Sequence, residues 1–306
     1  MERYVIHITK KCNMACTYCY EKDRESTYSW EEIENLCKNI IESNKNGIHY
    51  SIEFLGGEPC LVFNNLKKAV AYFKKNDPEH CDYFIITTNG TIVNDDIADF
   101  LLKNPDVCFS ISLDGIAEAN KHRVMNSPER RESYDLVSYN IKCLIKLYKI
   151  PVHQLSVHIV THPLNAKYIY QSIKDIYDMG IRSISIGTVE LCILLSDNYK
   201  NTFISEMKKV ADNILHGNLK GLRIDLFEDF NTEKPKGRIY IRDKNGKMIC
   251  ESYAEANDDI TKTDIYDSVP VSSEIEMFIF NLRKEVCLYY REEKKKCLIQ
   301  EYETFG

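Results

Sequence analysis

The chain has 306 residues, of which 44% are hydrophobic and 28% are charged, and its formal net charge is −6. This composition is ordinary for a soluble globular protein, and the length suits one large α/β domain or a core with a smaller appendage. The acidic balance, with one short basic run at 294–296, indicates neither nucleic-acid nor membrane binding. The chain has no bilayer-spanning apolar stretch and no signal-peptide-like start, so we expect it to be cytoplasmic.

Strands and helices alternate along the first two thirds of the chain. Alternating and apolar runs predict strands at 3–9, 49–55, 83–88, 107–113, 155–161 and 182–189. Helical periodicity predicts intervening helices at 29–44, 64–76, 93–103, 131–148, 166–179 and 199–216, with Ser29 or Thr27 as the first N-cap. Six βα units predict a parallel sheet covered by helices, an α/β fold. Because a closed barrel needs eight units, we expect a partial (β/α)6 TIM-like barrel at 1–218.

The remaining residues, 219–306, are expected to form a small α+β cap. Residues 237–250 predict a β-hairpin with Asn245 and Gly246 in its turn, and a helix is expected at about 274–297. One hairpin and one helix are too little to bury an independent core, so we expect this cap to depend on the barrel.

The first strand is followed by Cys12, Cys16 and Cys19, three cysteines within eight residues. A reducing compartment disfavours disulfides, and the chain's isolated cysteines are expected in the core, namely Cys37, Cys81, Cys108 and Cys143. Three thiolates are one fewer than a structural zinc or a complete iron–sulfur site takes. The group of three cysteines therefore indicates a metal site with one open coordination position.

Small and polar residues follow the other strands, at 56–59, 87–90, 112–115, 161–165 and 189–192. The carboxyl ends of parallel strands in such barrels gather the functional groups. Each segment could also be an ordinary turn. Glu58, flanked by Gly56, Gly57 and Pro59, places a carboxylate on a backbone that a ligand could approach closely, as an ammonium site requires. The positions of these five segments at the ends of consecutive strands favour the binding of a polar cofactor.

These motifs carry a family resemblance. The CX3CX2C spacing with Tyr18 before the last cysteine, followed by GGEP at 56–59, resembles the radical S-adenosylmethionine (SAM) superfamily. The segments SLDG at 112–115 and KHR at 121–123 resemble the branch with SPASM or twitch extensions, which includes sulfatase-maturating enzymes and peptide maturases. The resemblance covers residues 4 to 190.

The resemblance implies a cofactor pair and a reaction. Cys12, Cys16 and Cys19 would bind three irons of a [4Fe–4S] cluster, and the methionine end of SAM would chelate the fourth. Reductive cleavage of SAM would give a 5′-deoxyadenosyl radical, which would abstract hydrogen from a peptide or protein side chain. Such an enzyme is expected to work anaerobically as an oxidoreductase-type maturase.

The resemblance also assigns further residues to the site. Gly56, Gly57 and Glu58 would receive the methionine amino group, and Tyr18 would lie near the adenine. Ser112 and Asp114 would bind the ribose or methionine end, and Arg123 would pair with the methionine carboxylate. Thr88 and Asn89 would line the same mouth. Arg123 could instead form a surface ion pair, and Glu190, a candidate for contacting substrate, could instead be a helix cap or surface carboxylate.

An auxiliary [4Fe–4S] cluster is the open question of the C-terminal region. Cys250 stands where the extension has a cluster ligand, but the usual upstream cysteine is absent. Cys192, Cys250, Cys287 and Cys297 total four cysteines, yet their spacing matches no cluster motif, and Cys287 and Cys297 lie nearly three turns apart on the expected helix. We therefore favour a clusterless cap over an auxiliary cluster.

The expected partners are a peptide or protein substrate and a reductant such as flavodoxin or ferredoxin. Because the barrel begins near residue 4, a leader-peptide-binding domain would be a separate protein. A radical SAM dehydrogenase or mutase acting on a small molecule shares every motif and remains an alternative. A non-catalytic zinc or iron–sulfur module is the other alternative, which GGEP and the missing fourth ligand disfavour.

Overall fold

The computed structural model describes residues 2–21, 23–44, 46–189, 196–228, 236–242, 248–255 and 273–304. These residues form one nine-stranded sheet with the order β7-β6-β5-β4-β3-β2-β1-β9-β8. Its parallel part runs in chain order and comprises β1 (Glu2–Thr9), β2 (Tyr50–Gly56), β3 (Cys81–Thr88), β4 (Val107–Ser112), β5 (Leu155–Thr161), β6 (Ser183–Thr188) and β7 (Arg223–Ile224). The expected α/β partial barrel is confirmed, and the two-residue β7 is an addition to the six predicted strands.

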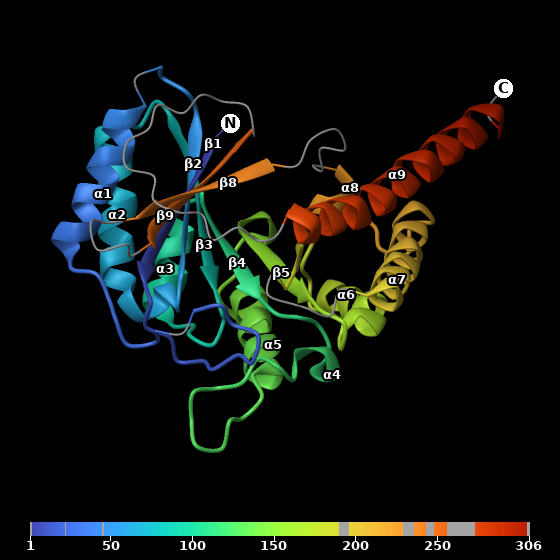
Figure 1. Cartoon of the computed structure of the whole chain (residues 1–306), viewed down its shortest axis with the longest axis horizontal. Helices are drawn as coiled ribbons and strands as arrows, with labels where there is room; N and C mark the ends of the chain where they lie inside the picture. Colours follow the sequence, from blue (N-terminus) through green and yellow to red (C-terminus); the bar gives the residue numbers. More distant parts are fainter. Residues whose placement is uncertain are drawn as a thin grey trace.

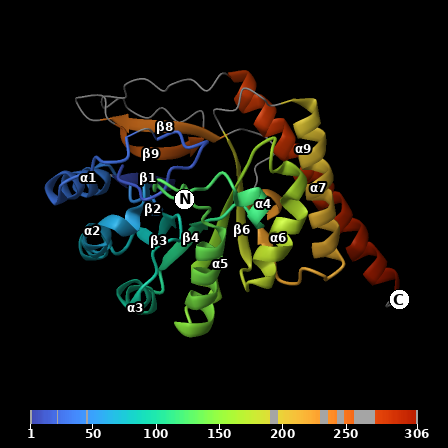
Figure 2. The same ribbon diagram turned by 90° about the horizontal axis from the view of Figure 1, so that it is seen from below.

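Helices cover the outer, convex face of this sheet. They are α1 (Trp30–Ser43), α2 (Phe63–Asn76), α3 (Asp95–Lys103), α5 (Tyr134–Lys142), α6 (Ile169–Asp178) and α7 (Asp197–Leu215), with a short α4 (Ala117–Asn120) after β4. Seen from below, they form an arc outside the strands (Figure 2). Ser29 caps α1 in a reciprocal capping box with Glu32, which decides between the two expected caps.

The helix expected at 131–148 begins later in the structure. Val124 and Glu132 pair in an antiparallel bridge, and Met125 donates its N–H to the carbonyl of Arg131, so this backbone is extended. The helix therefore starts at Tyr134 and ends as a π-helical turn at Cys143–Leu147.

The two faces of each strand differ in chemistry. In β5, the buried Leu155, Val157 and Ile159 belong to the core beneath the helices, whereas the alternate residues Ser156 and His158 are only half-buried. Side chains alternate between the faces of a strand, so these two face the concave side. The apolar core thus lies between sheet and helices, and the concave side is more polar and more open.

The C-terminal residues extend the same sheet. β8 (Lys236–Arg242) and β9 (Met248–Glu255) pair antiparallel, and β9 also pairs antiparallel with β1, from Arg3 opposite Tyr253 to Ile6 opposite Cys250. The expected hairpin is confirmed, while its expected turn at Asn245 and Gly246 lies outside the described residues.

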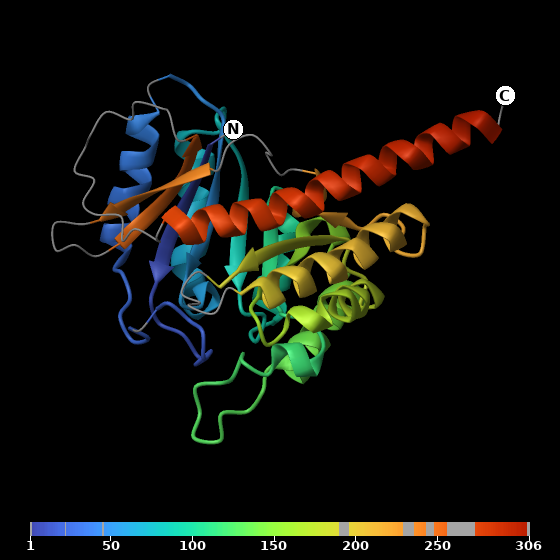
Figure 3. The ribbon, with the colours of Figure 1, turned by 45° about the vertical axis from the view of Figure 1, so that its right-hand side comes forward.

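The expected C-terminal helix is confirmed and is longer, as α9 (Ser273–Thr304). Leu282, Val286 and Tyr290 of α9 are buried, and the Tyr290 ring stacks on Phe227 of α8 (Asp225–Glu228) with centroids 4.5 Å apart. One end of α9 lies against α7, and the other projects away from the body (Figures 1 and 3). No helix in the described part of the chain is long and apolar enough to cross a membrane.

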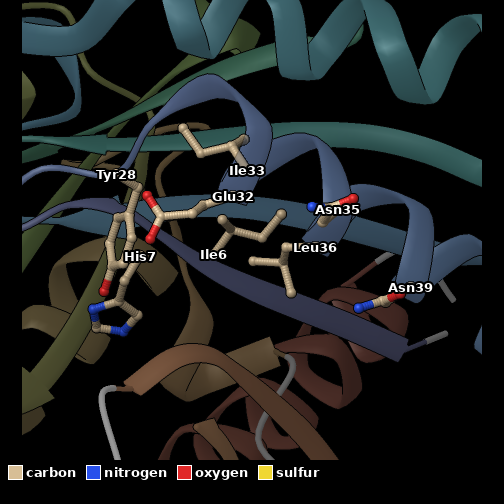
Figure 4. A pocket seen from close by; sticks show the side chains of 8 residues that line it. All are labelled: Ile6, His7, Tyr28, Glu32, Ile33, Asn35, Leu36 and Asn39. Atoms are coloured by element: carbon tan, nitrogen blue, oxygen red, sulfur yellow. The ribbon is translucent and has the colours of Figure 1, made fainter. Parts of the chain in front are cut away.

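A cavity of about 220 Å³ lies between β1 and α1 (Figure 4). Its lining comes from these two elements and the residue that precedes the α1 cap: Ile6, His7, Tyr28, Glu32, Ile33, Asn35, Leu36 and Asn39. None of the site residues expected from the sequence lines it.

Candidate active site at the strand exits

The cysteine loop after β1 is held against the segment that follows α4. Ala15 donates its N–H to the carbonyl of Val124 at 2.7 Å, and Thr17 donates to the carbonyl of His122 at 3.0 Å. Met14 and Met125 form a bridge in the same antiparallel pairing. Backbone hydrogen bonds therefore fix the loop on both sides of Cys16.

Two arginines also bind the backbone between Cys12 and Cys16. Arg24 donates through Nη1 to the carbonyl of Met14, and Arg130 donates through Nη2 to the carbonyl of Ala15 at 3.1 Å. Hydrogen bonds from charged donors are stronger than neutral ones. The sequence analysis missed both residues, since no local motif marks an arginine that contacts a distant carbonyl.

The three thiols lie close enough to affect one another. Burial raises the pKa of Cys12 to about 11, the N–H that Met14 donates to its sulfur lowers it, and the negative charges of Glu58, Cys16 and Cys19 raise it again. Burial also raises the pKa of Cys16, against the charge of Arg123. The thiolates of Cys12 and Cys16 therefore require a positive partner, which bound iron would supply.

The thiol arrangement fits a cluster better than a single ion. Within the described ranges, no three His, Cys, Asp or Glu side chains converge closely enough to hold one metal ion. A [4Fe–4S] cluster has no such need, because each of its cysteine thiolates binds a different iron. Three half-buried thiols on one fixed loop thus fit the expected cluster with one iron left for another ligand.

The two glycines after β2 lie directly on the start of the cysteine loop. A Cβ on Gly56 would lie 2.1 Å from the carbonyl oxygen of Thr9, and one on Gly57 would lie 2.2 Å from that of Lys11. Gly57 donates its N–H to the carbonyl of Thr9, and Glu58 donates to that of Lys11, both at 2.8 Å. The glycines therefore allow the chain's own backbone to approach, which joins the GGE segment to the cysteine loop.

Glu58 is fully buried and accepts three hydrogen bonds. Its Oε1 accepts from the N–H of Cys60 at 2.9 Å and from the Thr88 hydroxyl at 2.7 Å, and its Oε2 accepts from the N–H of Asn89 at 2.6 Å. Burial raises the pKa of this carboxyl, and the three donors act in the opposite direction. The Cys60 thiol also interacts with this carboxyl, so its roughly four acceptor positions all face donors of the chain itself. The structure thus brings Glu58, Thr88 and Asn89 together as expected.

Asp114 joins the cysteine loop to the β4 exit. It accepts from the Tyr18 hydroxyl through Oδ2 and from the N–H of Val160 through Oδ1 at 3.0 Å. Arg123 Nε lies 3.0 Å from Oδ1, but its N–H is not aligned with that oxygen, so the contact is an ion pair rather than a hydrogen bond. The Arg123 guanidinium lies over the Tyr18 ring, 5.5 Å from its centroid.

The alternative interpretation of Arg123 as part of a surface ion pair is wrong. Arg123 is 6% exposed and Asp114 is 2% exposed, so the pair is buried. Burial tends to lower the pKa of Arg123, but the negative charges of Asp114, Tyr18 and Cys16 together outweigh this and raise it. Ser112, at the end of β4, lies opposite His158 of β5 and is half-buried.

Two histidines that the sequence analysis did not single out complete this group. The ring of His162, which follows β5, lies 5.6 Å from Tyr18 and 5.0 Å from His122, edge to face. His122 Nδ1 lies 3.0 Å from the Thr17 hydroxyl. The available signal was positional, since both histidines lie in segments that follow strands β4 and β5.

The remaining sequence candidates lie after β6. Glu190 and Cys192 lie outside the described residues, as does the side chain of Cys250. Cys287 is buried with its sulfur 3.8 Å from the carbonyl of Phe227, and Cys297 lies ten residues further along the same helix. Because ten helical residues span roughly 15 Å, these two thiols cannot ligate one cluster while α9 is intact.

A partial α/β barrel with a three-cysteine loop and a buried carboxylate at its strand exits defines a class of cofactor-dependent enzyme. The Radical SAM superfamily model matches residues 6–176, so the chain belongs to this superfamily and is a radical SAM enzyme.

Similar proteins include an uncharacterised protein of Methanocaldococcus jannaschii, 28% identical over 62% of this chain and 63% of that protein. A cysteine-type anaerobic sulfatase-maturating enzyme of Clostridium novyi is 30% identical over 49% of this chain and 41% of its own length. The chain therefore spans between two fifths and two thirds of these relatives. Native anSMEcpe with bound AdoMet and Cp18Cys peptide shares the fold, with a TM-score of 0.61 and 22% identity over 73% of this chain and 63% of that one.

Proposed function

We propose that this radical SAM enzyme modifies a side chain of a peptide or protein. One observation carries the proposal: the cysteine loop is hydrogen-bonded directly to the GGE segment (Gly56, Gly57 and Glu58) and to Asp114. The same site therefore combines three thiols with groups that can bind the amino-acid part of SAM. A [4Fe–4S] cluster at Cys12, Cys16 and Cys19 would supply the electron that cleaves SAM to methionine and a 5′-deoxyadenosyl radical, the hydrogen abstractor.

The chain's own residues would bind and orient SAM. Glu58 would be the charged partner of the methionine ammonium, with Thr88 and Asn89 holding the carboxylate in place. Arg123 faces Asp114 through Nε, which leaves its two Nη groups for the methionine carboxylate. Tyr18, fixed by Asp114, presents its ring at the adenine end, and Ser112 lies beside them at the β4 exit.

The concave side of the sheet supports a polar substrate. Several strand residues on this side are half-buried and carry hydroxyl or imidazole groups, namely Thr87, Ser112, Ser156, His158 and Ser185. The Nδ1 of His158 is fixed by a 2.8 Å contact with the Ser185 hydroxyl. Hydroxyls and imidazoles there can bond the amide groups of a peptide. The named peptide in the anSMEcpe structure and the sulfatase-maturating relative support this substrate class.

We expect one protein partner besides the substrate. A one-electron donor such as flavodoxin or ferredoxin would reduce the cluster. Glu190 is our candidate for contacting substrate.

The test is SAM cleavage by anaerobically reconstituted protein with dithionite. We expect 5′-deoxyadenosine and methionine from the wild type and none from the variant in which Cys12, Cys16 and Cys19 are all Ala. Cys143→Ala, which changes a cysteine in the π-helical turn after α5, serves as the control and should retain cleavage. Cleavage by the triple variant would refute the cluster assignment. When a cysteine-containing peptide is added, the yield of 5′-deoxyadenosine should rise and the mass of the peptide should change. The substrate class would be contradicted if the peptide stayed unchanged while the enzyme turned over a small molecule.

A further inference from the structure

A small basic face lies on the exposed side of the cysteine loop, and the SAM contacts proposed above do not account for it. Backbone hydrogen bonds pair residues 13–17 with residues 122–126, so the segments 11–20 and 121–132 lie side by side (Figure 1). The exposed charged residues of these two segments are four cations and two carboxylates, namely Lys11, Lys121, Glu129, Arg130, Arg131 and Glu132. We call the two segments together the basic face.

The cations of the basic face are available to a partner. Lys11, Lys121, Arg130 and Arg131 form no ion pair within the described residues, whereas the buried Arg123 between them is paired with Asp114. The chain as a whole carries a formal net charge of −6. An acidic protein is therefore repelled by the molecule in general and attracted to this face in particular.

Arg130 connects the basic face to the cysteine loop. Its Nη2 donates to the carbonyl of Ala15 at 3.1 Å, and Ala15 directly precedes Cys16. Its backbone has a φ of 46°, in the left-handed region that residues other than glycine adopt rarely, and its N–H donates to the carbonyl of Ser127 at 3.0 Å. A protein that contacts Arg130 is thus separated from Cys16 by one hydrogen bond and one residue.

We propose that the basic face docks an acidic one-electron carrier protein, which is oxidised by one electron as the cluster at Cys12, Cys16 and Cys19 is reduced by one. The inference rests on the proposed function, in which such a donor reduces the cluster.

The size and the position of the basic face suit this role. Electron-transfer complexes are small, burying less than about 1,200 Å² of surface, and opposite charges orient their encounter. On its other side the cysteine loop contacts the strand exits through Glu58 and Asp114, where SAM is expected. A protein donor therefore approaches the loop from the basic face.

The test measures how fast the cluster is reduced, by stopped-flow recording of its visible absorbance in anaerobically reconstituted protein without SAM or peptide. The donor is a reduced flavodoxin of acidic net charge. Lys121→Glu combined with Arg131→Glu reverses two charges of the basic face and should slow reduction by flavodoxin about tenfold or more at low ionic strength. Lys142→Glu combined with Lys146→Glu changes the net charge equally, at the far end of α5 and in the turn after it. This matched control should stay within about twofold of the wild type.

Salt and a second reductant separate docking from damage to the cluster. Raising the ionic strength from about 0.01 M to about 1 M shortens the Debye length from about 30 Å to about 3 Å, so the wild type should slow and its difference from the reversed variant should largely vanish. Reduced methyl viologen, a small cation, should reduce the reversed variant at least as fast as the wild type. Equal flavodoxin rates in wild type and reversed variant would overturn the inference, as would slow reduction of that variant by both reductants. A wild type that holds no reducible cluster would overturn the proposed function as well.

Discussion

At the scale of single residues, the site is built from buried side chains that already have partners within the chain. Glu58 shows this most clearly, because its three donors come from three different positions: Cys60 beside it, and Thr88 and Asn89 at the next strand exit. A residue of this kind stabilises the fold and prepares the site at once. Its substitution should therefore change both stability and ligand affinity.

Glu58→Gln provides the test. The carboxamide turns one accepting oxygen into a donor that faces an existing N–H or hydroxyl, and this should lower the free energy of unfolding by about 1–3 kcal/mol. The loss of the charged partner of the methionine ammonium should weaken SAM binding roughly tenfold or more, because a charged hydrogen bond contributes about 1.5–3 kcal/mol. Urea unfolding and equilibrium dialysis measure the two effects.

A matched control for this variant is Glu42→Gln, which changes an exposed carboxylate paired with Lys38 on α1. Its effect on the free energy of unfolding should stay below about 1 kcal/mol, because exposed ion pairs contribute little. Unchanged SAM affinity in Glu58→Gln would remove Glu58 from the ligand site, while an intact iron content would show that the cluster loop itself survives the change.

At the scale of elements, the C-terminal segments depend on the barrel for their packing. The hairpin strand β9 has β1 as its second neighbour, and α9 buries Leu282 and Val286 in the core that it shares with α7 and α8. Both elements therefore make their contacts with the barrel: β9 pairs with β1, and α9 packs against α7. We therefore propose that the residues after the expected boundary at residue 218 form an appendage of the barrel and not an independent domain.

A fragment of residues 219–306 should accordingly fail to fold when it is expressed alone. A two-stranded hairpin is marginal in water, and a helix without its packing partner loses the burial that stabilises it. Circular dichroism should show a gradual, non-cooperative loss of signal on heating, whereas the whole chain should melt cooperatively. A sigmoidal melt of the fragment, with matching calorimetric and van't Hoff enthalpies, would contradict this dependence.

At the scale of the whole molecule, the distribution of cysteines predicts the iron content. Cys287 faces the interior against Phe227, and α9 keeps Cys297 well away from it along the helix axis. After anaerobic reconstitution we therefore expect about four irons per chain, the content of a single cubane cluster. Iron and sulfide analysis, with Mössbauer spectroscopy to confirm the cluster type, measures this.

The informative variants for iron content are Cys250→Ala and Cys287→Ala, since each would lose iron if an auxiliary cluster existed. Both should keep about four irons per chain. A wild-type content near eight that falls to about four in Cys250→Ala would show that the C-terminal region does bind a second cluster.

The sequence alone determined the features that depend on neighbouring residues. Apolar periodicity placed six strands and their helices, the start of the first helix was expected at Ser29 or Thr27, and the cysteine spacing located the thiol loop after β1. Hairpin and helix were likewise visible at the C-terminal end. These features are local because hydrogen bonding and side-chain alternation within one element repeat over a few residues.

Only the tertiary structure decided which distant groups meet. Arg130 binds the carbonyl of Ala15 across 115 positions, Asp114 gathers Tyr18 and Arg123 into a buried group, and β9 joins the sheet at β1. The later start of α5 has the same origin, in the bridge between Val124 and Glu132. Local periodicity carries no information on such pairs, because their geometry is set when the strands align and bring their carboxyl ends to one edge of the sheet.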